Sequence, residues 1–403
     1  MKLSEILKER GYVYQHSVDV QEITDKEKRT LYLGIDPTAD SMHVGHLQAM
    51  LVLRRFLEDG HKVIVLLGGG TGMIGDPSGK SEERVLLDEE TLTKNAQGIK
   101  TQAQKLFQSD KFEIQNNLDW LGQLKVIDFL RDIGKNFSVN AMMSRDSVKD
   151  RLENREQGIS YTEFSYMLLQ SYDFYHLFEN AGCNLQIGAS DQWGNMVSGV
   201  DLIRRKTGKP AYALSFPLLV NKSTGKKFGK SEGSAVWLDA TKTSVFDFYQ
   251  FWFNTQDSDV EEYLLRMTLL PKADIDSVME EQKANPASRT AQKNLAFEVT
   301  ALVHGEEEAE KVAKSSEDLF SGQGNADSAP TLTIAAGTAI LDALVESGLA
   351  ASKREARQFI EDGAVLVNGK KITEDRALTN EDFKEGTALL KKGKRNIVAL
   401  TLN

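Results

Sequence analysis

Two histidines, His43 and His46, are the first side chains in this 403-residue chain whose type and spacing could do chemistry. They belong to the stretch His43-Val44-Gly45-His46, which leads into the apolar-periodic run 47–57, a pattern typical of a helix. Unpaired backbone N–H groups and the positive end of a helix dipole favour an anion at such a position. Gly45 has no side chain, so a bulky group could lie directly against the backbone. The stretch therefore predicts an anion site at a helix start.

The elements that must position these histidines alternate between strand and helix. Apolar runs at 30–35 and 62–67 predict buried strands on either side of the helix, which indicates a βαβ unit in a parallel sheet. Two further strands are expected at 183–187 and 211–220. Helices are expected at 4–11, 91–107, 118–134, 137–143, 146–154, 161–179 and 195–205, and one after another from 243 to 320.

Polar residues follow the ends of two of these strands. Asp191 and Gln192 come just after the strand at 183–187, at the edge where open α/β sheets bind ligands. Asp76 lies in the glycine-rich loop 68–80, where a carboxylate is suited to an ammonium group. The loop is not a Walker phosphate loop, because its glycine-to-lysine spacing is too short and Pro77 interrupts it. A loop of many positive-φ turns is the alternative interpretation.

A polar stripe runs along the helix expected at 161–179. Tyr166, Gln170 and Asp173 are spaced i, i+4 and i+7, so they share one face. A core face would be apolar there, so the stripe predicts a lined pocket, with an exposed polar face as the alternative. Farther along the chain, the polar loop 221–231 carries several cations; they are Lys222, Lys226, Lys227 and Lys230.

Charge and composition restrict the class of protein. The net charge of −10 argues against a generally basic nucleic-acid-binding surface, yet residues 348–403 carry a net +3 and the remainder −13. A small basic module suits a local polyanion contact, and a solvated charged tail is the alternative. The single cysteine excludes disulfides within the chain, and the six histidines lack metal-ligand spacing, so no metal site is expected. A charged N-terminus and the absence of long apolar runs predict a cytoplasmic protein without membrane contact.

The two signatures together resemble a known family. His-Val-Gly-His at 43–46 and Lys-Phe-Gly-Lys-Ser at 227–231 are similar to the paired ATP-binding signatures of class I aminoacyl-tRNA synthetases. With Gly-Asp-Pro-Ser-Gly-Lys at 75–80, the helix sequence at 161–174 and Gln-Ile-Gly-Ala-Ser-Asp-Gln-Trp-Gly-Asn at 186–195, the chain resembles the bacterial tyrosyl-tRNA synthetases over nearly its whole length.

The resemblance implies a fold of three parts. An α/β, Rossmann-like parallel-sheet catalytic domain binding tyrosine and ATP would occupy 1–220. The lysine loop and an all-α domain contacting the anticodon arm would occupy 221–320, followed by a linker at 321–333. A small α+β RNA-binding domain of the ribosomal S-four-like type would occupy 334–403, with Lys353, Arg354 and Arg357 on one solvent face of a helix.

The resemblance also implies a tyrosine–tRNA ligase. The tyrosine carboxylate would attack the α-phosphate of ATP, which brings Mg²⁺ with it, and tyrosine would then pass to the 3′-terminal adenosine of tRNA(Tyr). No tightly bound cofactor is expected. The implied catalytic residues are Thr38, His43, His46, Lys227 and Lys230. The implied ATP-binding residues are Gly34, Asp36, Thr38, His43, Gly45, His46, Asp191, Lys227, Lys230 and Ser231, and Lys80 and Arg84 would add charge.

Recognition of tyrosine is assigned in the same way. Tyr32 and Asp173 would hydrogen-bond the phenol, and phenylalanine would leave this buried pair unsatisfied. Asp76, Tyr166 and Gln170 would take the ammonium group, and Gln192 would orient the carboxylate. Leu33 and Ala189 depart from the family near the nucleotide.

The resemblance further implies a homodimer, with segment 129–143 and Tyr161 at the interface. Two other functions are considered. A tryptophanyl-tRNA synthetase has the same fold and signatures but would not need the Tyr32 and Asp173 pair. An RNA-binding structural or splicing protein with a degenerate synthetase body would not need intact histidines and lysines.

Overall fold

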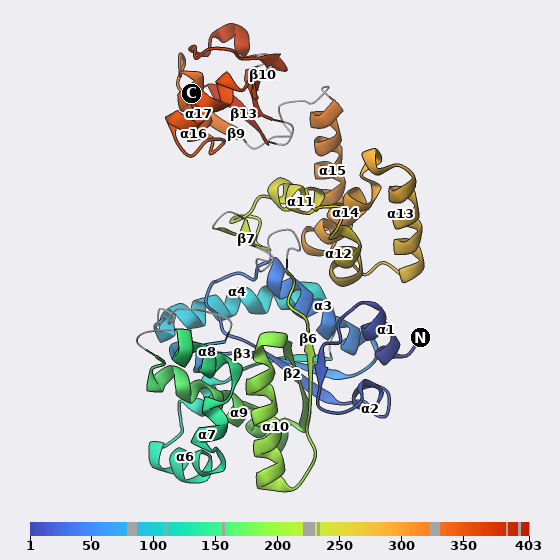
Figure 1. Ribbon diagram of the computed structural model, residues 1–403, viewed down its shortest axis with the longest axis vertical. Coiled ribbons are helices and arrows are strands. Elements are labelled where there is room, and N and C mark those ends of the chain that lie inside the picture. Colours follow the sequence, from blue (N-terminus) through green and yellow to red (C-terminus); the bar gives the residue numbers. More distant parts are fainter. Residues whose placement is uncertain are drawn as a thin grey trace. The chain divides into compact units, whose positions relative to one another are not determined.

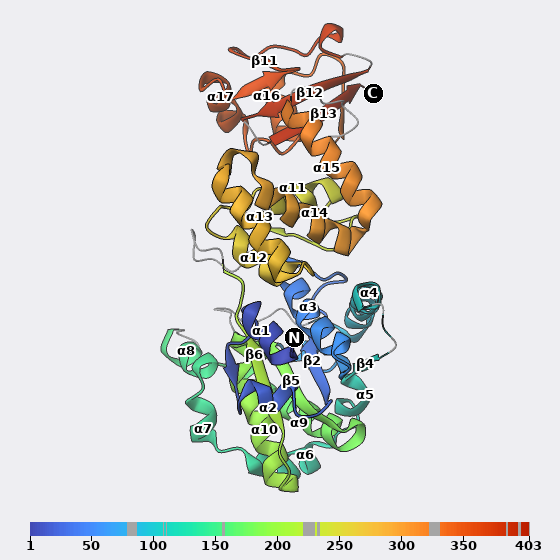
Figure 2. The ribbon, with the colours of Figure 1, turned by 90° about the vertical axis from the view of Figure 1, so that its right-hand side faces the viewer.

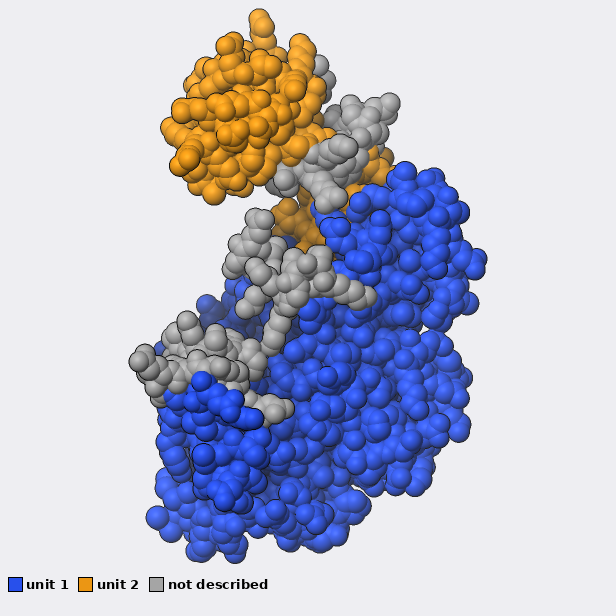
Figure 3. All heavy atoms as spheres, in the orientation of Figure 1, with its two compact units in different colours: residues 1–243, 254–303 blue, residues 244–253, 304–403 orange. Residues whose placement is uncertain are grey.

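The computed structural model describes residues 1–78, 87–107, 109, 111–154, 158–220, 230–231, 234–321, 331–383, 386–393 and 396–402. Contacts divide the chain into two compact units, one of residues 1–243 and 254–303 and one of residues 244–253 and 304–403 (Figure 3). The helices expected at 243–320 fall in both units, because α11 (Val245–Phe253) packs against α15 (Glu306–Ser321). The domain boundaries given above stay predictions.

The first unit is built on a six-stranded sheet. The strand order is β1-β6-β5-β2-β3-β4, and β1 is antiparallel to β6 while the other neighbours are parallel. Counting only the parallel strands in chain order, the arrangement is that of a doubly wound Rossmann sheet, whose order reverses between β2 and β5. The strands are β1 Gln15–His16, β2 Thr30–Ile35, β3 Lys62–Leu67, β4 Phe112–Asn116, β5 Cys183–Ala189 and β6 Tyr212–Phe216.

The central strands are buried on both faces, as their continuous apolar runs predict. Tyr32 and Ile64 pack with Phe174 of α9 on one face, while the alternating Leu31 and Val63 are buried on the other. Helices α9 and α10 pack along each other and on β5, and α3 packs on β3 (Figures 1 and 2). The predicted α/β fold with a parallel sheet is confirmed.

Most helices of the first unit agree with the sequence, but α2 was not predicted and one predicted helix is wrong. The predicted helix at 118–134 is wrong: α5 ends at Leu121, Gly122 follows, and α6 begins only at Val126. The expected strand at 211–220 is shorter, because Pro217 has no N–H to donate after β6. The helices are α1 Leu3–Glu9, α2 Val20–Thr24, α3 Val44–Glu58, α4 Glu89–Phe107, α5 Leu118–Leu121, α6 Val126–Asp132, α7 Val139–Met143, α8 Asp146–Asn154, α9 Tyr161–Ala181, α10 Trp193–Thr207, α12 Val260–Met267, α13 Lys272–Ala284 and α14 Thr290–His304. No helix within the described ranges has both the length and the apolarity to cross a membrane.

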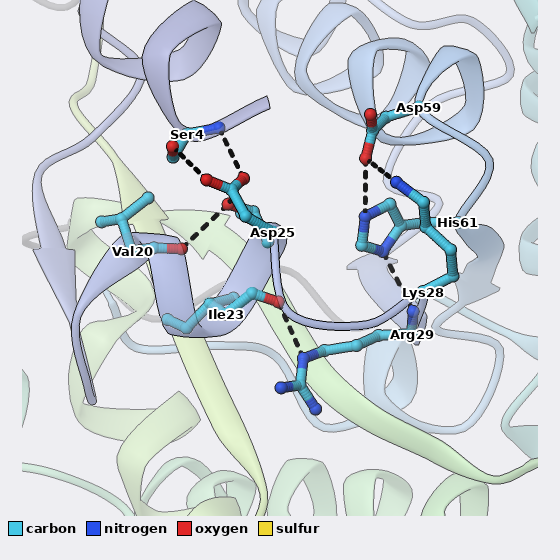
Figure 4. A network of polar contacts seen from close by, with 9 residues as sticks. Ser4, Val20, Ile23, Asp25, Lys28, Arg29, Asp59 and His61 are labelled. Carbon is cyan, nitrogen blue, oxygen red and sulfur yellow. Dashed lines mark hydrogen bonds and ion pairs between the residues drawn. The ribbon is translucent and has the colours of Figure 1, made fainter. Parts of the chain in front are cut away.

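A polar network fixes the N-terminal segment, which the sequence left largely unassigned, to the sheet (Figure 4). Ser4 donates to Asp25 through its hydroxyl (2.5 Å) and its backbone N–H (3.1 Å), which ties α1 to the end of α2. The backbone N–H of Arg29 donates to His61 Nδ1 (3.1 Å), and His61 Nε2 donates to Asp59 (3.2 Å). Burial lowers the pKa of His61, so the ring is held neutral where β2 and β3 begin.

The second unit holds a five-stranded sheet of order β11-β10-β12-β13-β9, antiparallel except for the β13–β9 pair. The apolar faces of α16 and α17 pack in its core with Val365 and Leu390. Besides α11 and α15, the elements are β9 Thr331–Ile334, α16 Ile340–Glu346, α17 Lys353–Glu361, β10 Val365–Val367, β11 Lys370–Lys371, β12 Thr387–Lys392 and β13 Asn396–Leu402.

Candidate active site

A cavity of about 410 Å³ opens at the carboxyl ends of β2 and β5, where the strand order of the sheet reverses. This is the position at which doubly wound sheets bind ligands. All the candidate residues of the catalytic, ATP and tyrosine sets that precede residue 200 lie in its wall. They are Tyr32, Gly34, Asp36, Thr38, His43, Gly45, His46, Asp76, Tyr166, Gln170, Asp173, Asp191 and Gln192.

The two histidines cap the start of α3. His43 is the N-cap residue, and its Nδ1 accepts the Gly45 N–H (3.0 Å), while His46 Nδ1 accepts the His43 N–H (3.2 Å). Because each Nδ1 is an acceptor, the proton of each neutral ring must be on Nε2, which makes both Nε2 atoms donors. A Cβ at position 45 would approach the His43 ring to 2.8 Å, so glycine is needed there for the cap itself.

Asp173 and Tyr32 form the buried end of the cavity. Asn117 Nδ2 donates to one Asp173 oxygen (2.9 Å), and Trp120 Nε1 donates to the other (2.7 Å). Burial, with a smaller contribution from the charge of Asp36, nevertheless raises the pKa of Asp173 to about 7. The Tyr32 hydroxyl is buried and has no hydrogen-bond partner among the described residues. A ligand hydroxyl at this end of the cavity would meet both an acceptor and an unsatisfied hydroxyl.

Two further carboxylates line the middle of the cavity. The Tyr166 hydroxyl donates to Asp36 (3.0 Å), and Gln192 Nε2 donates to Asp76 (2.6 Å). Asp76 is 4% exposed and Gln170 Oε1 has no partner among the described residues, so the two offer oxygen acceptors in one wall. An ammonium group needs acceptors of this kind. Gln192 is bonded to Asp76 in this structure, so it belongs to the same polar group.

Close packing, rather than backbone conformation, explains most glycines of the 68–78 loop. Of the glycines described there, only Gly75 has a positive φ, of 85°. A Cβ on Gly68 would collide with the Asp36 carboxylate, and one on Gly69 with the Asn116 side chain. The interpretation of this loop as a series of positive-φ turns is therefore wrong.

The remaining candidate residues do not line this cavity or fall outside the residues that the structure describes. Lys222, Lys226 and Lys227, like Lys80 and Arg84, fall outside the described residues. Lys230 and Ser231 form the two-residue strand β7, which pairs with β8 (Ser234–Ala235). In the second unit, Lys353, Arg354 and Arg357 are all exposed on α17, opposite the buried Ala356 and Ile360.

Sequence reasoning missed several polar residues of the cavity. Asn117 directly follows β4, so the rule that selected Asp191 at the end of β5 could have found it. Gln186 is 3% exposed in the middle of β5, and its Oε1 has no partner among the described residues. A glutamine inside an apolar strand was the signal. Leu33 and Ala189, the departures from the family, also line the cavity.

Comparisons with known proteins agree with this geometry. The profile of the family "tRNA synthetases class I (W and Y)" matches residues 24–321, and that of the "Tyrosine--tRNA ligase SYY-like C-terminal domain" matches residues 322–400.

Solved structures give the same result. A C-terminally truncated mitochondrial tyrosyl-tRNA synthetase of Aspergillus nidulans is 33% identical, with 79% of this chain and 94% of that chain covered and a TM-score of 0.71. The corresponding Coccidioides posadasii enzyme is 32% identical, with coverage of 78% and 91% and a TM-score of 0.67. The tyrosyl-tRNA synthetase of Archaeoglobus fulgidus, at 17% identity, 77% and 99% coverage and a TM-score of 0.58, shows likeness of fold.

The chain therefore belongs to the class I tRNA synthetases of the tryptophan and tyrosine group. Within that group it belongs to the tyrosyl-tRNA synthetases, because the C-terminal profile is that of tyrosine–tRNA ligases and the Aspergillus nidulans and Coccidioides posadasii structures, each above 30% identity, are tyrosyl enzymes. The predicted family, fold class and ligase activity are confirmed, in preference to the tryptophanyl and structural alternatives. The bacterial subgroup stays a prediction.

Proposed function

We propose that the cavity between β2 and β5 binds L-tyrosine and ATP side by side, forms tyrosyl-adenylate, and then passes tyrosine to the 3′-terminal adenosine of tRNA(Tyr). The observation that carries this assignment is the set of residues that line one cavity. Two imidazole donors, His43 and His46, lie in its wall at the start of a helix, and a buried tyrosine–carboxylate pair, Tyr32 and Asp173, can hydrogen-bond a phenol.

The first step is a displacement at phosphorus. A carboxylate oxygen of tyrosine bonds to the α-phosphorus of ATP, and the bond from that phosphorus to the bridging oxygen of pyrophosphate breaks. Because the nucleophile is already an anion, no protein base is required. The barrier lies in alignment and in the negative charge that gathers on the phosphate oxygens, so the protein contributes positioning and donors.

The nucleotide half of the cavity suits that role. His43 and His46 present Nε2–H donors toward the phosphates, and Thr38 lies with them in the cavity wall. Gly34 and Gly45 leave room for the adenosine and phosphates, and Asp191, at the end of β5, holds the ribose. The lysine-rich segment supplies Lys227, Lys230 and Ser231 to the leaving pyrophosphate, and Mg²⁺ enters as part of the ATP substrate.

The tyrosine half selects its substrate by hydrogen bonding. The phenol of the substrate donates to Asp173 and accepts from the Tyr32 hydroxyl, which pairs the atom that otherwise lacks a partner. Phenylalanine would leave both groups buried and unsatisfied. At the other end of the substrate, Asp76, Tyr166 and Gln170 take the ammonium group, and Gln192 orients the carboxylate. Because the Tyr166 hydroxyl donates its proton to Asp36, its oxygen is oriented as an acceptor for the ammonium group.

In the second step a terminal ribose hydroxyl of the tRNA attacks the tyrosyl carbonyl, and the bond to AMP breaks. We propose that the C-terminal residues 334–403 assist by holding the tRNA backbone through Lys353, Arg354 and Arg357. Lys353 is already paired with Asp342, so Arg354 and Arg357 contribute most. Replacing both arginines by alanine should weaken tRNA binding and reduce its salt dependence, while adenylate formation is unchanged. Equal tRNA affinity in the double variant would contradict this role.

We also propose that the chain works as a homodimer through the surface of α6 and α7 and the start of α9. Several large apolar side chains are exposed there; they are Val126, Ile127, Leu130, Val139, Met143 and Tyr161. Ile127 is 72% exposed and Tyr161 74%, which is costly unless another protein surface covers them. A cytoplasmic location, also proposed, is tested by fractionation of the source cells.

The test of the activity is exchange of labelled pyrophosphate into ATP without tRNA, with tyrosine, phenylalanine and tryptophan compared. Exchange that depends on tyrosine alone is expected. Exchange with phenylalanine at a similar rate would contradict the proposed phenol filter, and exchange with tryptophan would contradict the substrate. No exchange with any of the three would contradict adenylate formation.

A further inference from the structure

The loop between β2 and α3, residues 36–43, carries Thr38 at its centre and His43 at its end. Met42 and Ser41 are buried, but Thr38 is exposed toward the cavity. Within its own βαβ unit the loop is bonded to the start of α3 through His43, which bonds to Gly45 and His46. Other side chains and segments approach the loop from elsewhere in the chain and contact residues 37–43.

Helix α4 holds this loop from one side. Asn95 Nδ2 donates to the carbonyl of Pro37 (2.9 Å) in a buried bond. Gln102 is bonded twice: its Oε1 accepts the Met42 N–H (2.7 Å), and its Nε2 donates to Ser41 Oγ (2.9 Å). Between these two residues the backbone of α4 comes so close that a Cβ on Gly98 would collide with the loop. Asn95, Gly98 and Gln102, which follow one another at intervals of three and four residues on α4, thus face the same loop.

The segment that follows the second signature holds the loop from the other side. Val44 N–H donates to the Val236 carbonyl (3.0 Å), and Leu238 N–H donates to the Met42 carbonyl (2.9 Å), so the backbone is paired on both sides of His43. The bridge pairs His43 with Trp237, whose indole meets the His43 ring edge-on with centroids 6.1 Å apart.

An ion pair strengthens the same side. Lys242 Nζ lies 2.8 Å from Oδ1 of Asp40, which is a loop residue. The same Nζ lies 5.5 Å from the centre of the Trp237 ring. The backbone N–H of Trp237 donates to Thr243 Oγ1 (3.0 Å), a bond within the same segment. The segment therefore contacts the loop through backbone hydrogen bonds, the ring contact of Trp237 with His43 and the ion pair of Lys242 with Asp40.

We propose that Asn95 and Gln102 of α4, with Trp237 and Lys242 of the opposing segment, form a two-sided brace that sets the position of Thr38 and His43 for attack at the α-phosphate. These are positioning residues, since in the structure they touch the loop and lie outside the cavity wall. The inference rests on the proposed function, because it assigns the brace to the ATP half of that site. An error of about 1 Å in such a group lowers the rate by about a hundredfold, so loosening one contact should be measurable.

The test compares pyrophosphate exchange with tyrosine binding in the full-length chain. Gln102→Ala removes both bonds to the loop, and should lower kcat/KM for ATP about tenfold while the Kd for tyrosine, measured by equilibrium dialysis without ATP, stays within about twofold. Gln102→Glu keeps an acceptor for the Met42 N–H and should recover most of the loss. Thr101→Ala, at the neighbouring exposed position of α4, is the matched control and should behave as the parent.

The opposite side is tested independently. Trp237→Ala should produce the same ATP-specific loss, and Trp237→Phe, which keeps an aromatic ring against His43, should restore activity. Gln102→Ala and Trp237→Ala variants that match Thr101→Ala would overturn the brace, as would a loss of tyrosine affinity in parallel with ATP use. Failure of the parent protein to exchange pyrophosphate would instead overturn the proposed function, so the two failures are distinguishable.

Discussion

Asp173 is a buried carboxylate whose ionisation matters for the proposed phenol filter. Burial raises its pKa to about 7, although Asn117 and Trp120 donate to it and favour the charged form. Because this pKa is above the ordinary value of an aspartate, the Asp173 carboxylate of the protein without bound tyrosine begins to take up a proton in the physiological pH range. An ionised acceptor binds a phenol hydroxyl more strongly than a neutral one does.

Tyrosine affinity should therefore depend on pH. Above pH 7 Asp173 is ionised and accepts the phenol; as the pH falls to 6 the carboxyl is increasingly protonated, and we expect the Kd for tyrosine to rise by several-fold to about tenfold. Equilibrium dialysis between pH 6 and 8 checks this. Phenylalanine, bound weakly throughout, should show no such change, and a flat tyrosine profile would contradict the role of Asp173.

Tyr32 allows a second prediction at the same scale. Tyr32→Phe removes only the hydroxyl that has no partner among the described residues, so folding should be unaffected. It should raise the KM for tyrosine about tenfold and reduce selectivity over phenylalanine by the same factor, because one hydrogen bond to the phenol is lost. Comparison of the two substrates in pyrophosphate exchange measures it. Unchanged selectivity would show that Tyr32 does not contact the phenol.

Among the elements, α1 has a function that its sequence does not reveal. Arg10, 5% exposed, donates to the carbonyls of Leu265 and Thr268, both at 2.8 Å, and to that of Leu270. These carbonyls belong to the last turn of α12 and the residues after it, where backbone acceptors lack helical partners. Arg10 thus fastens the N-terminal segment to α12, together with the Tyr12 hydroxyl, which donates to the Arg266 carbonyl (2.6 Å).

Arg10→Ala should destabilise the protein by about 3 kcal/mol, since several carbonyls would lose a charged donor in a buried place. Denaturant unfolding followed by tryptophan fluorescence gives the free energy of unfolding. Lys8→Ala, at an exposed position of α1 two residues before Arg10, is the control and should change it by less than about 0.5 kcal/mol. Equal effects of the two substitutions would mean that the carbonyls find other donors.

At the scale of the whole molecule, most of the exposed large apolar side chains among the described residues lie on α6 to α9 of the first unit. The proposed dimer predicts that Ile127→Asp shifts the protein to a monomer, because a buried unpaired charge in an apolar interface costs several kcal/mol. Sedimentation equilibrium measures the mass. Tyr14→Asp changes an apolar side chain that is 60% exposed elsewhere and should leave the dimer intact. A monomeric parent protein would contradict the proposal directly.

Local patterns in the sequence were sufficient for many elements. The apolar runs at 30–35 and 62–67 form strands with these same bounds, and the stripe of Tyr166, Gln170 and Asp173 does line a cavity. The helix predicted at 118–134 is interrupted after Leu121, and Val126 and Ile127 at the start of its second part are exposed. A periodic pattern indicates that a face is apolar, but not what covers it.

The sequence by itself determined the fold class, the two signatures and the polar groups that follow the strands, because strand burial, helix caps and loop composition are local properties of the chain. The tertiary structure alone decided which of these groups meet. Asp36, Asn117 and Asp173 come from distant segments, yet they line one cavity because β2, β4 and α9 are brought together in the fold. The same holds for Gln102 and Trp237, which contact one loop from opposite sides. Such neighbours depend on long-range packing, for which a single sequence carries no periodic signal.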